Sequence, residues 1–165
     1  MIQTDFLVIG SGIAGLSYAL KVANHHKDAT VTLVTKAEKE ESNTKYAQGG
    51  IATVTNTDTD SFEQHIQDTL IAGDGLCNED VVRMVVEEAP ARLEELIEWG
   101  TNFDKTIKGE YSLGKEGGHS QNRILHHKDI TGYEIARALL EETEKHPNIH
   151  LLEDHFVVDF ITNGC

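Results

Sequence analysis

Hydrophobic residues in the first part of the chain form two short runs on either side of a helical stretch. Asp5–Ile9 is a β-rich apolar run that ends at a glycine, and a second, β-branched run covers 29–35. Between the runs, Leu16, Leu20 and Val22 recur at helical spacing. The order and the roughly 30-residue length predict one right-handed βαβ unit with parallel strands.

The rest of the chain alternates irregular polar segments with helical and extended patterns. Long loops are expected over 36–56 and 101–129. Helical periodicity predicts three helices, at 62–73, 79–99 and 131–145. Pro90 lies inside the second of these and predicts a kink, or a break into two helices, near Glu88.

The long second helix has an apolar stripe that is expected to be its buried side. The stripe comprises Val81, Val82, Val85, Ala89, Leu93, Leu96 and Ile97. Two short strands are predicted near the end of the chain, at 149–152 and 156–161. Asn163-Gly164 then gives a hairpin-turn signal with no returning strand after it.

Composition narrows the class of protein. The 165 residues include 14 Lys and Arg against 28 Asp and Glu, which leaves a formal charge of −14 and argues against a nucleic-acid binder. No apolar run reaches the roughly 18 residues of a membrane span, and the polar start lacks a signal peptide's basic region, so a cytoplasmic protein is expected. Cys77 and Cys165 have neither disulfide-framework nor zinc-site spacing.

A glycine-rich turn carries the clearest chemistry. Gly10-x-Gly12-x-x-Gly15 follows the first run and opens the helix, and this spacing supplies a tight turn, a close backbone approach to a pyrophosphate, and close helix packing. A bound dinucleotide is predicted, with a turn kept only for packing as the alternative. The acidic residue expected about 20 positions on is missing, since Thr35-Lys36 stands there.

With this turn in view, the chain resembles a family of flavoproteins that includes succinate dehydrogenases, fumarate reductases and L-aspartate oxidases. The matching segments are Val8–Leu16, Thr44–Ala52, His65 with Asp68–Gly73, and Lys115–Ser120. The last of these is similar to the aspartate oxidase branch. The resemblance implies an α/β, Rossmann-like FAD-binding domain with a parallel sheet over residues 1–165. This domain is expected to be incomplete, ending before its returning strands, a capping domain and a helical domain.

The resemblance also implies how FAD is held. Gly10, Ser11, Gly12, Ile13, Ala14 and Gly15 would surround the pyrophosphate, and Lys36 would take the adenosine side. Val158 and Asp159 would flank the adenine. The segment beside the flavin ring would be Asn43, Thr44, Lys45, Tyr46, Ala47, Gln48, Gly49 and Gly50. Asn43 stands where respiratory relatives have a histidine bonded to the flavin, and an amide is no such nucleophile, so non-covalent FAD is expected.

For the substrate, the resemblance implies that Glu116 lies near the ammonium of L-aspartate and that His119 contacts substrate or flavin. A solvated glutamate and a structural histidine are the alternatives. The implied reaction oxidises L-aspartate to iminoaspartate, with oxygen or fumarate as acceptor, as the first step of NAD biosynthesis through quinolinate. Quinolinate synthase is a partner that this suggests. No metal is expected at His126 and His127, because no second cluster completes a coordination sphere.

Two other functions stay open. One is a soluble fumarate reductase or succinate dehydrogenase type of flavoprotein, against which Glu116 argues. The other is an inactive dinucleotide-binding fragment, because the family's proton-transferring arginine lies beyond position 165. Arg123 and Lys128 are interpreted as surface or loop-anchoring charges. The parent protein is therefore expected to be the enzyme, and these residues alone are expected to be inactive.

Overall fold

The computed structural model describes residues 1–162 and divides the chain into two compact units. Unit 1 combines Met1–Ala47 with the segment that starts at Gly132, and unit 2 is Gln48–Thr131. The turn expected at Asn163-Gly164 lies outside the described residues. Within residues 1–162, no helix has both the length and the apolar character to cross a membrane.

Unit 1 is built on the βαβ pattern that the hydrophobic runs predict. Its elements are β1 (Phe6–Ile9), α1 (Ile13–His25), β2 (Val31–Val34), α4 (Thr131–Lys145) and β6 (Ile149–Leu152). The strands are all parallel in the order β1-β2-β6, with Phe6 opposite Val31 and Val31 opposite Ile149. The predicted α/β fold with a parallel sheet is confirmed.

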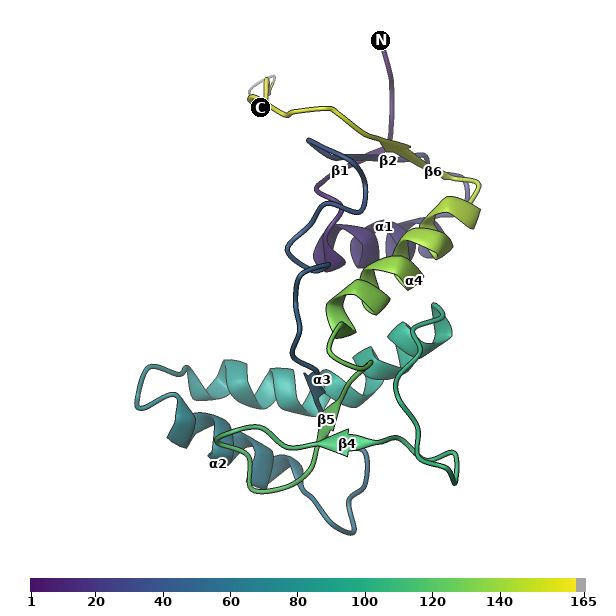
Figure 1. Cartoon of the computed structure of the whole chain (residues 1–165). Helices are drawn as coiled ribbons and strands as arrows, with labels where there is room; N and C mark the ends of the chain where they lie inside the picture. The colour runs from purple at the N-terminus through teal and green to yellow at the C-terminus, as the bar shows by residue number, and fades with distance from the viewer. Residues whose placement is uncertain (163–165) are drawn as a thin grey trace. The chain divides into compact units, whose positions relative to one another are not determined.

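The core of unit 1 lies between this sheet and its helices. Figure 1 shows α1 and α4 on one side of the sheet. Leu16 and Leu20 of α1 and Leu139 of α4 are completely buried there, which removes apolar surface from water and stabilises the packing. Leu7 and Ile9 of β1 stay about half exposed.

The turn from β1 into α1 depends on two glycines with different roles. Gly10 has φ +101°, a conformation that side chains disfavour. At Gly15 an added Cβ would lie 2.0 Å from the carbonyl oxygen of Gly10. The third glycine of the motif is therefore required for the close approach of helix and strand.

Unit 2 combines two helices with a small antiparallel sheet. Its elements are β3 (Ile51–Ala52), α2 (Phe62–Ala72), α3 (Glu79–Glu98), β4 (Leu113–Gly114) and β5 (Ile124–Leu125). The strand order is β3-β5-β4. Ser61 and Asn78 cap α2 and α3 by accepting backbone N–H groups on their side chains, which explains where these helices begin. Leu93, Phe103 and Leu125 form a core cluster of this unit.

Two expectations for α3 need correction. The helix is continuous through Pro90, so the predicted break into two helices is wrong. Buried side chains lie on both sides of the proline, Val86 before it and Leu93 after it, and their packing holds the two halves in one helix. Val81 and Val85 are about half exposed and not buried as expected.

The strand expected over 156–161 is also wrong. Residues 156–162 have no regular secondary structure, and Phe156, Val158 and Phe160 are exposed. A strand needs backbone partners, and none of the described strands pairs with this segment. The alternating apolar residues that suggested a strand are side chains that no described residue covers.

Replacing Gly15 by alanine tests the contact at the glycine turn. We expect Gly15→Ala to lower the free energy of unfolding by about 3 kcal/mol, because the methyl group overlaps the Gly10 carbonyl and the backbone must shift. Gly117→Ala is the control, since an added Cβ there meets no atom within 4 Å. Urea unfolding checks both variants, and equal stabilities would contradict the role of Gly15.

Candidate functional site

A pocket of about 460 Å³ opens where β1 and β2 end in unit 1. It is lined by Ile9, Gly10, Ser11, Gly12, Val34, Thr35, Lys36, Glu41, Ser42, Asn43, Thr44, His155, Phe156 and Val157. The carboxyl ends of parallel strands are the usual ligand-binding edge of such sheets. The pocket therefore lies where a dinucleotide is expected.

Hydrogen bonds join the two strand ends and the segment after β6 around this pocket. The buried Ser11 hydroxyl donates to Thr35 Oγ1 at 3.2 Å. The N–H of His155 donates to the Thr35 carbonyl at 2.9 Å. Thr35 thus connects the glycine turn to 155–157, which form the far wall.

The loop at 42–47 is fixed against the glycine turn by Thr44. Its hydroxyl accepts the N–H of Ile13, the first residue of α1, at 3.0 Å. At the other side of the loop, the N–H of Gly132 donates to the Ala47 carbonyl at 2.9 Å, and a Cβ on Gly132 would lie 2.0 Å from the Thr44 carbonyl. Close backbone packing therefore holds this loop in place.

The start of α1 is suited to an anion. Gly12 is its N-cap and has no side chain to cap the first turn, where Thr44 accepts the N–H of Ile13 and the following N–H groups have no capping side chain. Such groups and the positive end of the helix dipole attract phosphate. Lys36, exposed at the pocket, adds a cation. The residues present therefore fit the pyrophosphate of a dinucleotide such as FAD.

The predicted cofactor residues divide into four groups. Gly10, Ser11, Gly12, Lys36, Asn43 and Thr44 line the pocket. Ile13, Ala14, Gly15, Lys45, Tyr46 and Ala47 belong to the same turn or loop but do not line it. Gln48, Gly49 and Gly50 lie in unit 2. Val158 and Asp159 are exposed and do not line the pocket, whereas the neighbouring Phe156 and Val157 do.

In unit 2, the paired glycines lie beside Glu116. An added Cβ at Gly49 would come within 3.6 Å of Glu116 Oε1, and one at Gly50 would lie 2.2 Å from the Leu125 carbonyl. Glu116 itself is exposed. Its carboxylate is therefore available to a ligand next to a glycine backbone.

His119 contacts a buried histidine of α2. The rings of His65 and His119 meet edge to face with centroids 5.9 Å apart, and the Nδ1 atoms of both are buried without a hydrogen-bond partner. Burial lowers the pKa of His65, and the nearby positive charge of Arg123 lowers it further. His65 is therefore neutral at neutral pH.

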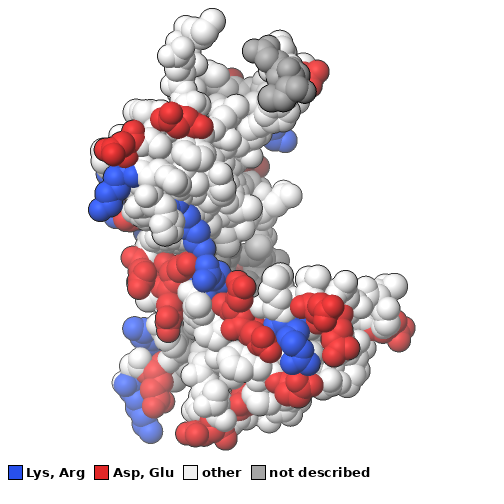
Figure 2. All heavy atoms as spheres, turned by 180° about the vertical axis from the view of Figure 1, so that it is seen from behind, with Lys and Arg blue, Asp and Glu red and all other residues white. Residues whose placement is uncertain are grey.

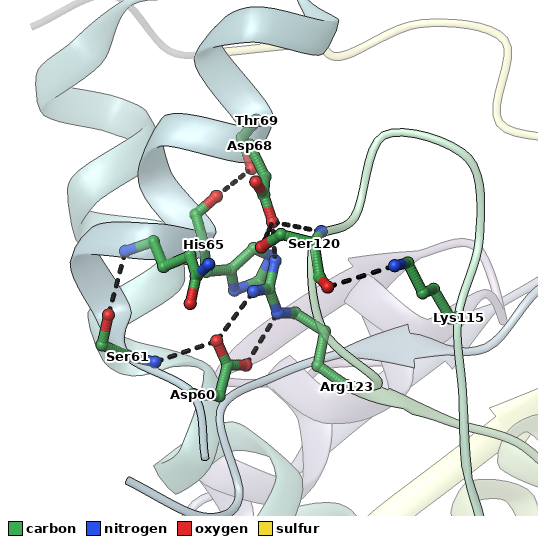
Figure 3. A network of polar contacts seen from close by, with 9 residues as sticks. Asp60, Ser61, His65, Asp68, Thr69, Lys115, Ser120 and Arg123 are labelled. Carbon is green, nitrogen blue, oxygen red and sulfur yellow. Dashed lines mark hydrogen bonds and ion pairs between the residues drawn. The ribbon is translucent and has the colours of Figure 1, made fainter. Parts of the chain in front are cut away.

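The strongest electrostatic feature of unit 2 is the buried guanidinium of Arg123, which is 1% exposed (Figure 3). It binds both oxygens of Asp60, with Nε to Oδ2 at 2.8 Å and Nη2 to Oδ1 at 2.7 Å. Its Nη1 donates to Asp68 Oδ2 at 2.6 Å. Arg123 is thus a loop-anchoring charge, as one of the two interpretations held, and not a surface one.

The two carboxylates keep their charge because of these bonds. Burial alone would raise the pKa of Asp60, but the hydrogen bonds from Arg123 and from the Ser61 N–H outweigh it and lower that pKa. Burial likewise opposes the lowered pKa of Asp68, which the Ser120 N–H and hydroxyl and then Arg123 bring about. Both groups are ionised well into the acid range.

Two further histidines of unit 2, His126 and His127, lie next to acceptor oxygens. His126 Nδ1 lies 3.1 Å from Asp104 Oδ2, and His127 Nδ1 lies 2.7 Å from the Asn102 carbonyl. Within residues 1–162, no group of three or more His, Cys, Asp or Glu is placed to hold a metal ion. On the face seen in Figure 2, acidic and basic side chains are interspersed and form no broad basic area.

Sequence reasoning missed some of these features. The pocket residues that it did not assign to the cofactor are Ile9, Val34, Thr35, Glu41, Ser42, His155, Phe156 and Val157. Their position after the ends of β1, β2 and β6 was the available signal. The pairing of Arg123 with Asp60 has no such signal, because the two residues are 63 positions apart.

The fold and the pocket define an α/β dinucleotide-binding protein. Residues 5–165 match the family described as FAD binding domain, and the chain belongs to this family. FAD is the cofactor that the description of this family gives.

Named relatives narrow the comparison. The chain is 56% identical over 158 residues to L-aspartate oxidase 2-a, chloroplastic, of Nicotiana tabacum, and 47% identical over 165 residues to L-aspartate oxidase of Vibrio cholerae. These matches cover 96% and 97% of this chain but only 24% and 30% of the relatives. The chain thus spans less than a third of the length of the relatives it matches.

Solved structures agree in fold. An Escherichia coli quinol fumarate reductase matches with TM-score 0.91 and 32% identity, over 98% of this chain and 28% of that one. A Mycobacterium smegmatis Sdh1 complex matches with TM-score 0.81 and 30% identity, over 92% and 27%. The aspartate oxidases are thus nearer in sequence than these structures are.

The lowered carboxylate pKa values predict how unit 2 responds to acid. Because both pKa values lie below the ordinary 3.8, the unfolded chain binds protons at a higher pH than the folded one does. Their contribution is complete above about pH 5 and is lost as the pH falls through 3.8 and the lower folded values. Unfolding free energy measured from pH 6 to pH 2 should fall accordingly.

Asp60→Ala should reduce this loss in acid and should lower stability at pH 7 by about 3 kcal/mol. This is the lower end of the range for a broken buried pair, because Asp68 still compensates Arg123. The matched control is Asp58→Ala, an exposed acid two residues away, with an expected change of less than about 0.5 kcal/mol. Identical pH profiles for wild type and Asp60→Ala would refute this assignment.

Proposed function

We propose that the chain is the FAD-binding part of an FAD-dependent L-aspartate oxidase. The observation that carries the proposal is the 56% identity to a named L-aspartate oxidase over 96% of the chain. The position of the exposed Glu116 beside Gly49 agrees with it. The capping and helical domains of such an enzyme, and its remaining substrate groups, would come from outside residues 1–165.

The pocket in unit 1 is the proposed site of the FAD pyrophosphate and adenosine. Gly10, Ser11 and Gly12 present backbone to the phosphates, and Lys36 takes the adenosine side. The segment from Asn43 to Gly50 is proposed to run beside the flavin ring. Bound FAD would supply the hydride acceptor, with Val158 and Asp159 near the adenine.

The proposed reaction removes a hydride from the α-carbon of L-aspartate and a proton from its amino group, which gives iminoaspartate and reduced FAD. Oxygen or fumarate then reoxidises the cofactor. Glu116 is proposed to attract the substrate ammonium, which succinate lacks, and His119 to donate to a substrate carboxylate or the flavin. Iminoaspartate would be consumed by quinolinate synthase on the route to NAD.

Binding a dicarboxylate also takes cationic groups. Each of the four arginines in the chain is paired with carboxylates: Arg83, Arg92, Arg123 and Arg137. We therefore infer that the arginines for the substrate lie outside this chain. The cytoplasmic location stays a prediction, since the plant relatives are named chloroplastic.

A fumarate reductase is the second candidate, because quinol fumarate reductase shares this fold with 32% identity. The two functions differ in the substrate that reduces the cofactor. We expect anaerobic L-aspartate to bleach the flavin absorbance of the whole protein, and succinate to leave it unchanged. Bleaching by succinate alone would favour the fumarate reductase.

The isolated 165-residue chain is the comparator in that experiment. We expect it to produce no peroxide from L-aspartate and FAD at ordinary enzyme rates, since it lacks unpaired arginines. Turnover by the isolated chain would contradict this part of the proposal.

Asn43 predicts the mode of FAD attachment. Because an amide does not add to the flavin ring, acid precipitation of the FAD-loaded protein should release essentially all flavin into the supernatant. The visible flavin absorbance of the supernatant measures the release. Flavin that stays with the precipitated polypeptide would show a covalent bond and overturn the prediction.

A further inference from the structure

The loop between β4 and β5 carries both proposed substrate residues, Glu116 and His119. The strands pair Gly114 with Ile124, and the N–H of Arg123 donates to the Gly114 carbonyl at 3.1 Å. Inside the loop, the N–H of His119 donates to the Glu116 carbonyl at 3.2 Å. This hydrogen bond closes a turn between the two residues. A contact that fixes the loop next to His119 therefore also restricts the position of Glu116.

The loop is held from outside by Asp68 of α2. The N–H and the hydroxyl of Ser120 both donate to Asp68 Oδ2, at 2.8 and 2.7 Å. Lys115 reaches across the loop and donates to the Ser120 carbonyl at 3.1 Å (Figure 3). Ser120 thus accepts a hydrogen bond from Lys115, the first residue of the loop, and donates two to Asp68 of α2.

Asp68 is itself fixed by a buried charge. The same oxygen, Oδ2, accepts Arg123 Nη1 at 2.6 Å, and the rest of the Arg123 guanidinium is bound by both oxygens of Asp60. Charge-assisted, bidentate bonds of this kind are strong and directional. A rigid series of contacts therefore runs from Asp60 through Arg123 and Asp68 to Ser120.

We propose that Asp68 and Arg123 are positioning residues for substrate selection. They hold the 115–120 loop so that the Glu116 carboxylate stays beside Gly49, where it meets the ammonium of L-aspartate. The inference rests on the proposed function, since it concerns the same site. Arg123 is buried and its N–H groups donate to Asp60 and Asp68, while Asp68 Oδ2 accepts from Ser120 and Arg123, so the proposed role of both residues is indirect.

The physical reason is the freedom of an exposed loop. Glu116 and Gly117 are exposed, and the two consecutive glycines at 117 and 118 give the backbone beside Glu116 wide conformational freedom. If the loop samples many conformations, only the fraction of molecules with Glu116 in the binding-competent position can bind the ammonium. The apparent affinity for L-aspartate falls in proportion to that fraction. Release of Ser120 should therefore weaken selection of the ammonium and leave recognition of the two carboxylates intact.

The test compares KM for L-aspartate with the inhibition constant of succinate in the FAD-loaded whole protein. In Asp68→Asn we expect KM for aspartate to rise about tenfold, the effect of losing one charge-assisted hydrogen bond. The succinate constant should stay within about twofold, because succinate has no ammonium for Glu116 to bind. In Ser120→Ala, which keeps the backbone donor, KM should rise about threefold.

Two controls separate positioning from folding and from the proposed function. Leu93→Ala destabilises the core cluster of unit 2 without removing any hydrogen bond of the 115–120 loop, and it should leave the ratio of the two constants unchanged. Glu116→Gln should raise KM for aspartate at least as much as Asp68→Asn does. Flavin content and thermal unfolding establish that each variant is folded.

The outcomes are distinct. If Glu116→Gln raises KM while Asp68→Asn and Ser120→Ala both leave the ratio at the wild-type value, the positioning inference is wrong and the proposed function stands. If Leu93→Ala changes the ratio as Asp68→Asn does, the effect is loss of stability and the inference is again wrong. If the wild type does not oxidise aspartate, both the proposed function and the inference fail. If the wild type oxidises aspartate but Glu116→Gln has no effect, Glu116 does not select the ammonium, so the inference fails while the oxidase assignment stands. If Asp68→Asn does not fold, Ser120→Ala decides alone.

Discussion

The passage from β1 into α1 depends on one close contact, between Gly15 and the carbonyl of Gly10, where a Cβ would lie 2.0 Å from the oxygen. Because the helix comes this near to the strand, its free N–H groups point into the space beyond the sheet edge. Thr44 then docks on Ile13, and the loop at 42–47 forms a wall of the pocket. The pocket proposed for the cofactor thus depends on packing at one glycine.

Unit 2 relies on charge where unit 1 relies on backbone packing. Its antiparallel strands are two residues long and offer little pairing of their own. The buried guanidinium of Arg123, the residue before β5, binds Asp60 before α2 and Asp68 within α2. Removing either acid would leave the buried charge of Arg123 partly uncompensated, at a cost in stability. The network therefore favours this one arrangement of the loop and α2. The exposed Glu116 is positioned by this buried network.

Much of the fold could be predicted from the sequence, because βαβ spacing and helical periodicity are local signals. The glycine turn, Lys36, Asn43 and Thr44 were likewise found from motif and resemblance, and they line the pocket. At Pro90 the sequence left a kink and a break open, and tertiary packing decides for one continuous helix. The irregular 156–162 was not predicted, because the strand expected there has no partner among the described strands. Nor could periodicity show that Arg123 is buried, because a charge buried between two acids depends on contacts distant in sequence.

A crystal structure of the protein with FAD bound tests the central claim most directly. The account predicts the pyrophosphate against the backbone of Gly10, Ser11 and Gly12 at the start of α1, with Thr44 still accepting the Ile13 N–H. Lys36 should lie on the adenosine side. A pyrophosphate held elsewhere, or a glycine turn that faces only solvent while FAD is bound, would contradict it.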